Sequence, residues 1–163
     1  MKEKTKKKID TLFGFLILIG ILSACSVKDP RIGLSRQLGI DLMNDGTTLL
    51  HETDTIGWFG DGYILSELEC NDDSVLNDIM NNERWEALPL SDNVHRFFYG
   101  DFYLPNGLSI PVIDEGYYFF YDRHDQADDR YDDSDLFDRA SFNFTFAIYD
   151  TEENKLYICK LNT

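Results

Sequence analysis

The densest group of side chains that could do chemistry is a run of aspartates between Asp122 and Arg139. Clustered carboxylates supply the oxygen ligands that Ca²⁺ prefers. The spacing does not match an EF-hand loop counted from Asp129, because Tyr131 stands where that pattern needs a second ligand and no glycine follows. Two interpretations therefore stay open, a solvated acidic loop partly neutralised by its arginines and a calcium site. The candidate ligands are Asp129, Asp132, Asp133 and Asp135.

The histidines offer acid–base chemistry rather than a transition-metal site. His51, His95 and His124 lie far apart, and none belongs to an H-x-x-x-H pair. Glu52 and Asp54 follow His51, and His124 lies among aspartates, so either histidine could act as the general base of a hydrolase with a His/Asp site. The alternative is that both are ordinary surface histidines, which is the commoner case.

The sequence offers no activated nucleophile. It contains neither a G-x-S-x-G elbow nor a glycine-rich phosphate loop. Cys70 and Cys159 have apolar neighbours, which is typical of inert buried thiols. The two cysteines could instead form a disulfide in an oxidising compartment. We assign no catalytic or cofactor-binding residue, and the sequence favours a protein that is not an enzyme.

A third cysteine, Cys25, ends an apolar segment and suggests a lipid anchor. Residues 1–8 are rich in lysine, residues 12–22 are uncharged and apolar, and Ser23 and Ala24 are small. This order is typical of a secretory signal, and Leu22-Ser23-Ala24-Cys25 looks like a bacterial lipobox. We expect cleavage before Cys25 and attachment of a diacylglycerol, whose two chains suffice for a stable anchor. The alternative is an ordinary cleaved signal or an uncleaved anchor.

This interpretation predicts the location and the domain organisation. Residues 1–24 are the expected signal peptide, 25–30 a polar tether and 31–163 a single folded domain. The protein is expected at the extracytoplasmic face of the cell membrane, with the membrane and an envelope protein or ligand as its partners.

Charge narrows the choice of partner. The chain has 15 basic and 30 acidic residues, a net charge of -15. Without the 24 residues before Cys25 there are 10 basic and 28 acidic residues, or -18. Such a surface repels phosphate backbones, so we expect no nucleic-acid partner. It favours cations or basic protein surfaces, although the charge could also serve solubility alone.

The pattern of apolar residues predicts the elements that must position these groups. Short helices are expected over 31–38, 74–82 and 93–99, with Gly39 ending the first and Ser91 or Asp92 capping the last. Strands are expected over 47–55, 62–70, 116–121, 141–150 and 156–161. Residues 83–91 read as an irregular connection. The predicted fold is α+β, a mostly antiparallel sheet with two or three short helices packed on one face.

Two segments carry more specific expectations. Phe142, Phe144, Phe146 and Ile148 alternate with small or polar residues, which predicts a half-buried strand. Between the first two strands, the stretch DTIGWFGDGY places Trp58, Phe59 and Tyr63 among glycines. These aromatics either grip a ligand or partner from a loop or fold back over the sheet edge.

The mature chain resembles a group of short, uncharacterised lipoproteins of Gram-positive bacteria. The resemblance covers the chain from about Leu34 to its end and rests on LGIDL, DTIGWFGDG, LPLSDN, YDRHDQADDRYDDSDLFDR and SFNFTFAIYDTEENKLYICKL. The group has no assigned activity, so the resemblance implies a lipoprotein from a bacterium and no catalytic residue.

Overall fold

The computed structural model describes residues 29–100, 104–125 and 127–163. The predicted signal peptide, most of the tether and Cys25 lie outside this range. In the described residues the elements are α2 (Pro30–Leu38), β1 (Thr47–Asp54), β2 (Gly62–Cys70), α3 (Ser74–Met80), β3 (Trp85–Ala87), α4 (Asp92–Tyr99), β4 (Gly116–Asp122), β5 (Asn143–Asp150) and β6 (Lys155–Asn162). Residues 31–163 cluster as one compact unit.

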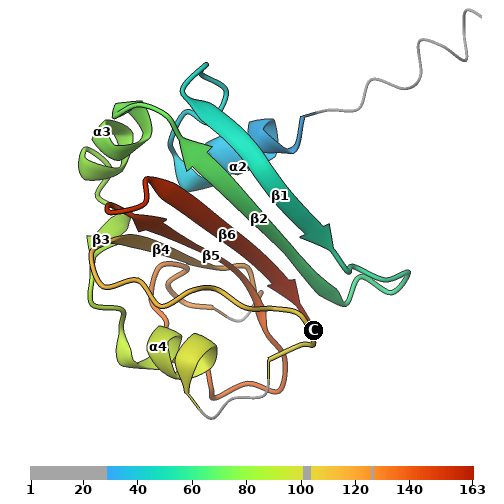
Figure 1. Ribbon diagram of the computed structural model, residues 1–163. Helices are drawn as coiled ribbons and strands as arrows, with labels where there is room; N and C mark the ends of the chain where they lie inside the picture. Colours follow the sequence, from blue (N-terminus) through green and yellow to red (C-terminus); the bar gives the residue numbers. More distant parts are fainter. Residues whose placement is uncertain (1–28, 101–103, 126) are drawn as a thin grey trace, which may run out of the picture. The chain divides into compact units, whose positions relative to one another are not determined.

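The strands form one antiparallel sheet in the order β1-β2-β6-β5-β4-β3 (Figure 1). Tight turns join β1 to β2 and β5 to β6, and β6 returns to lie between β2 and β5. Antiparallel pairing needs only such short connections, which residues 55–61, with two glycines, and the polar residues 151–154 provide. The predicted α+β class is confirmed.

The helices pack on both faces of the sheet, which corrects the expectation of a single covered face. Leu34 and Leu38 of α2, with Val75 and Ile79 of α3, belong to one core cluster. The apolar side chains of α4 belong to a second cluster with Phe144 and other residues of the opposite sheet face. Side chains alternate between faces along a strand, so residues of β4, β5 and β6 are shared out between the two clusters.

Strand β5 shows the consequence of this double covering. The expected strand was half-buried, with Thr145 and Ala147 on its open side. Both residues are fully buried, since α2 and α3 cover that face and Gln37 donates a 2.7 Å hydrogen bond to the Thr145 hydroxyl. A second correction concerns 85–87, which were expected to be irregular and form the short edge strand β3 against β4.

The Asp-rich connection between β4 and β5 wraps the sheet edge that the three-residue β3 leaves uncovered. Its middle is held at the end of β4, because Asp122 N–H donates to the Arg130 carbonyl at 2.7 Å. Tyr131 then contacts Phe119 and Tyr121 on one sheet face, and Leu136 belongs to the core cluster of the other face. The connection therefore crosses from one face to the other.

Both predicted helix ends have the expected geometry. Gly39 follows α2 at φ 68°, a left-handed conformation that glycine adopts without strain. The Ser91 hydroxyl accepts from Val94 N–H at the start of α4. Within the described residues, no helix is both long enough and apolar enough to cross a bilayer.

Candidate functional site

The candidate site is the tip of the β1–β2 hairpin, residues 55–61. The connection is closed by backbone hydrogen bonds, from Gly57 N–H to the Asp61 carbonyl at 2.9 Å and from Gly60 N–H to the Gly57 carbonyl at 3.0 Å. Gly60 has φ 89°, so the turn uses a conformation that most residues avoid. The loop is thus a folded turn with defined bonds.

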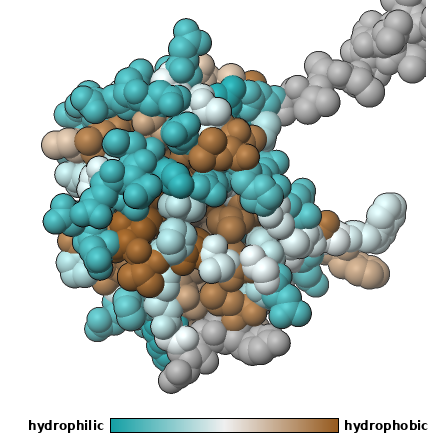
Figure 2. Space-filling view, in the orientation of Figure 1, coloured by the Kyte–Doolittle hydropathy of each residue, from teal (hydrophilic) through white to brown (hydrophobic). Residues whose placement is uncertain are grey.

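Trp58 and Phe59 stand at this tip and point into solvent. Trp58 is 98 % exposed and Phe59 is 92 % exposed. Figures 1 and 2 show the end of the hairpin projecting from the body of the domain. The interpretation that these two aromatics fold back over the sheet edge is therefore wrong, whereas Tyr63 does turn inward, with its hydroxyl donating to the Asn106 carbonyl at 3.2 Å.

The hairpin that carries the tip is uniformly acidic. Residues 47–70 contain five acids and no lysine or arginine, the acids being Glu52, Asp54, Asp61, Glu67 and Glu69. Asp54 and Asp61 flank the tip and are exposed. The Asp54 carboxylate accepts the Ile56 N–H at 2.9 Å, which places one negative charge at the base of the turn. The tip thus exposes two apolar aromatic side chains at the end of a negatively charged hairpin.

The candidate calcium ligands do not converge. Asp129 accepts from Tyr131 N–H at 2.9 Å and Asp132 from Ser134 N–H at 2.8 Å, so each carboxylate closes its own local turn. The Asp133 carboxylate instead accepts from the Ser91 hydroxyl at the start of α4. In the described part of the chain, no three histidine, cysteine or acidic side chains are grouped so as to hold a metal ion.

Asp133 is partly buried where the Asp-rich connection meets the start of α4. Burial raises the pKa of its carboxyl above the ordinary value, and the hydrogen bond from Ser91 opposes the rise. Asn93 of α4 donates to the Asp133 carbonyl at 2.9 Å. Asp133 therefore joins the Asp-rich connection to α4, which is a structural role.

A buried ion pair holds the start of the same connection. Asp122, 2 % exposed, accepts from the Arg139 guanidinium and from His124 N–H. Next to it, the Arg123 guanidinium donates to the carbonyls of Phe144 and Leu161 at 3.0 and 2.9 Å. Burial lowers the pKa of the Arg123 guanidinium. Its hydrogen bonds to the two carbonyls compensate for the water that burial removes. These groups fix the loop to the ends of β5 and β6.

The histidines proposed as general bases have different surroundings. His51 is exposed on β1, and its Nε2 lies 3.0 Å from the Thr53 hydroxyl. His124 is largely buried, with Nε2 3.2 Å from the Ser141 hydroxyl and Nδ1 3.3 Å from the Asp125 carboxylate. His95 of α4 packs its ring against Tyr99 at 5.6 Å between centroids. The three histidines belong to different elements, and the structure does not bring them together.

Cys70 and Cys159 are free thiols on opposite faces of the sheet. Each belongs to a different core cluster. Burial raises the pKa of Cys70 to about 11 and that of Cys159 to about 12. The structure thus has the separate buried thiols of the first interpretation and does not contain the disulfide.

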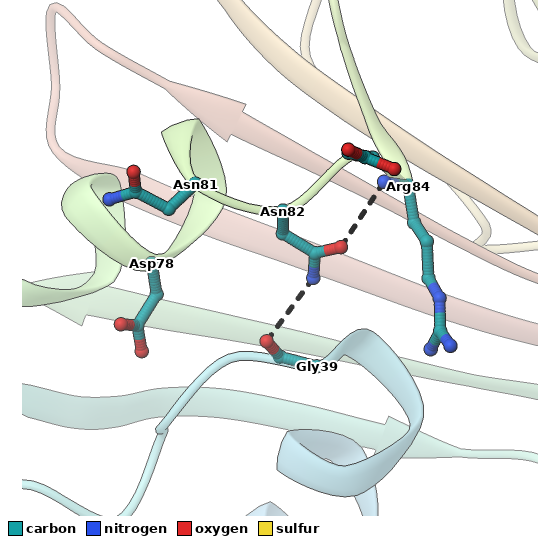
Figure 3. A pocket seen from close by; sticks show the side chains of 6 residues that line it. Gly39, Asp78, Asn81, Asn82 and Arg84 are labelled. Carbon is teal, nitrogen blue, oxygen red and sulfur yellow. Dashed lines mark hydrogen bonds between the residues drawn. The ribbon is translucent and has the colours of Figure 1, made fainter.

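An open polar hollow of about 540 Å³ lies beside the end of α2, lined by Gly39, Asp78, Asn81, Asn82, Glu83 and Arg84. Figure 3 shows Asn82 reaching from the end of α3 toward Gly39, whose carbonyl accepts its amide at 3.2 Å. The same side-chain amide donates to the Leu38 carbonyl, and the side-chain oxygen Oδ1 of Asn82 accepts from Arg84 N–H. Asn82 is thus committed to capping the last carbonyls of α2, which explains the hollow as a helix junction.

Comparison with family models, curated proteins and solved structures gave no match. The functional argument therefore rests on this chain alone.

The sequence already marked Trp58 and Phe59 by their glycine neighbours. The sequence did not indicate whether their side chains point into solvent or toward the sheet, because this depends on the hydrogen bonds of the folded turn.

Proposed function

We propose that this protein is a lipid-anchored binding protein of the bacterial cell envelope, which contacts a partner through the tip of the β1–β2 hairpin. The observation that carries the proposal is the exposure of Trp58 and Phe59 at 98 % and 92 %. Leaving two large aromatic side chains in water forgoes the free energy of burying them. Aromatic side chains are also the residues that most often dominate binding energy at protein interfaces.

The proposed anchor rests on the sequence. Its support is the order of lysine-rich start, apolar run, small residues and Cys25. From Cys25 to Pro30 the chain advances five residues, which can span at most about 18 Å. A lipidated chain would therefore hold the folded unit close to the outer surface of the membrane, where other envelope components are concentrated.

A binding role suits the described residues better than a hydrolase. A general base must lie within hydrogen-bond reach of a bound substrate. His51 lies on an exposed strand, and the hollow beside α2 contains no histidine, serine or cysteine. His124 bonds to Ser141 and Asp125 in the loop that fixes the sheet edge.

Two experiments test the proposal. Cells that express the chain are labelled with a clickable fatty acid. We expect a labelled protein in the membrane fraction, and we expect Cys25→Ser to abolish the label.

In the second experiment, membranes are solubilised in mild detergent and run on a native gel. We expect the wild-type chain in a complex well above the 18.9 kDa of the whole unprocessed chain, and Trp58→Ala/Phe59→Ala outside that complex.

The matched control is Met80→Ala, because Met80 is also an exposed apolar residue, on α3. It should leave the complex intact. An unlabelled wild-type chain would overturn the anchor, and equal migration of the tip variant and the wild type would overturn the contact.

A further inference from the structure

We infer that the tip binds a protein, and that the binding surface of this partner is an apolar socket rimmed by lysine or arginine. The inference rests on the proposed function and names the class of partner for the same site. It follows from the fixed shape of the tip and from the charge around it.

The tip is an ordered, projecting turn, and this shape suits insertion into a concave surface better than contact with a flat one. The Thr55 side chain and backbone bond to Tyr63 at the base of the turn, at 2.9 to 3.1 Å. Above this base, the Gly57–Asp61 and Gly60–Gly57 bonds close the loop. A preorganised loop loses little conformational entropy on binding. Trp58 and Phe59, standing clear of the sheet, fit a concave receptor.

The charge around the tip separates a protein from a lipid surface. A bilayer interface accepts tryptophan and phenylalanine, but bacterial membranes carry anionic headgroups that attract basic segments. Insertion of this tip would bring Asp54 and Asp61 to that negative surface, with no lysine or arginine in 47–70 to offset them. A socket rimmed by basic residues turns the same two carboxylates into favourable rim contacts, which raise the association rate and the specificity.

The test places a photo-reactive benzoylphenylalanine at position 59 of the full-length chain in living cells. We expect a discrete adduct with one protein, and no such adduct from the same probe at position 80 on α3. Charge reversal at the flanks, Asp54→Lys/Asp61→Lys, should lower the yield of this adduct roughly fivefold or more, because like charges would then face each other at the rim.

The matched control is Glu152→Lys/Glu153→Lys, which reverses two exposed acids in the turn between β5 and β6. That turn lies at the opposite end of the sheet, beyond the pairing of Glu69 with Lys155. The control should leave the yield unchanged. If the flank variant does not accumulate, the wild-type adduct is formed in isolated membranes at rising NaCl, where the yield should fall as the rim charges are screened.

Each other outcome overturns a stated part. Adducts with phospholipid in place of protein overturn the partner class and leave the proposed contact at the tip standing. A protein adduct that responds neither to charge reversal nor to salt overturns the basic rim. Absence of any adduct at position 59 overturns both the inference and the proposed contact.

Discussion

Thr55 and Tyr63 face each other across the base of the β1–β2 turn and are joined by three hydrogen bonds. Thr55 N–H donates to the Tyr63 carbonyl at 2.9 Å, the Thr55 hydroxyl donates to the same carbonyl at 3.1 Å, and Tyr63 N–H donates to that hydroxyl at 2.9 Å. Two of the three bonds depend on the side chain of one exposed threonine. The orientation of the tip relative to the two strands is therefore determined by residues at the base of the turn itself.

The first prediction concerns this base. Thr55→Val keeps the shape of the side chain but removes both hydroxyl bonds. We expect a loss of about 1 kcal/mol in the free energy of unfolding and faster amide hydrogen exchange across 57–61. Thr53→Val is the control, because the Thr53 hydroxyl bonds only to the exposed His51 among the described contacts. Equal exchange in both variants would show that the backbone alone holds the turn.

The second prediction concerns the Asp122–Arg139 pair that fixes the Asp-rich connection. Asp122→Ala leaves the buried Arg139 guanidinium without its counter-charge. Removing one partner of a buried ion pair costs about 3–5 kcal/mol, so urea denaturation should show a fall of that size. Asp128→Ala, at an exposed position of the same connection, should change stability by no more than about 0.5 kcal/mol.

The third prediction is a pH dependence at Asp133. Burial raises the pKa of this carboxyl in the folded protein above its ordinary value of 3.8. As pH rises through 3.8, the unfolded chain releases this proton first, so ionisation lowers stability until the raised pKa of the folded state is passed. Asp133→Asn removes this loss. Its unfolding free energy should therefore gain on the wild type between about pH 3 and pH 7, and parallel curves would contradict the assignment.

The fourth prediction concerns the thiols. Cys70 and Cys159 are buried, and the raised pKa of each leaves little thiolate at neutral pH. We expect slow maleimide labelling of both in the native protein and immediate labelling in denaturant, followed peptide by peptide by mass spectrometry. A Cys70–Cys159 peptide pair that separates only after reduction would contradict the free thiols.

The sequence predicted most elements because their signals are local. Gly62–Cys70 is a strand with the predicted bounds, and the Ser91 hydroxyl caps α4 as expected. Layering was harder to predict. The alternation in 141–150 indicates one apolar face, but it cannot indicate that α2 lies over Thr145 and donates a hydrogen bond to it from Gln37.

The candidate site was half predictable for the same reason. Glycines around Trp58 and Phe59 indicate a turn, and the sequence left open whether these aromatics cover the sheet or leave it. Tyr63 was grouped with them, yet it is the second residue of β2, and the alternation along the strand turns its side chain into the core. The aspartates of 122–138 suggested a shared calcium ion, whereas four of their carboxylates serve turns, a helix start and a buried arginine, namely those of Asp129, Asp132, Asp133 and Asp122.

The central claim is that Trp58 and Phe59 form a contact surface, and hydroxyl-radical footprinting tests it most directly. The same full-length chain is oxidised in native membranes and after purification in detergent, with Met43 and Met80 as exposed internal references. We predict that Trp58 and Phe59 react strongly in the purified protein and are protected in the membranes, while both methionines react alike in the two samples. Equal oxidation of Trp58 and Phe59 in both samples would contradict the account.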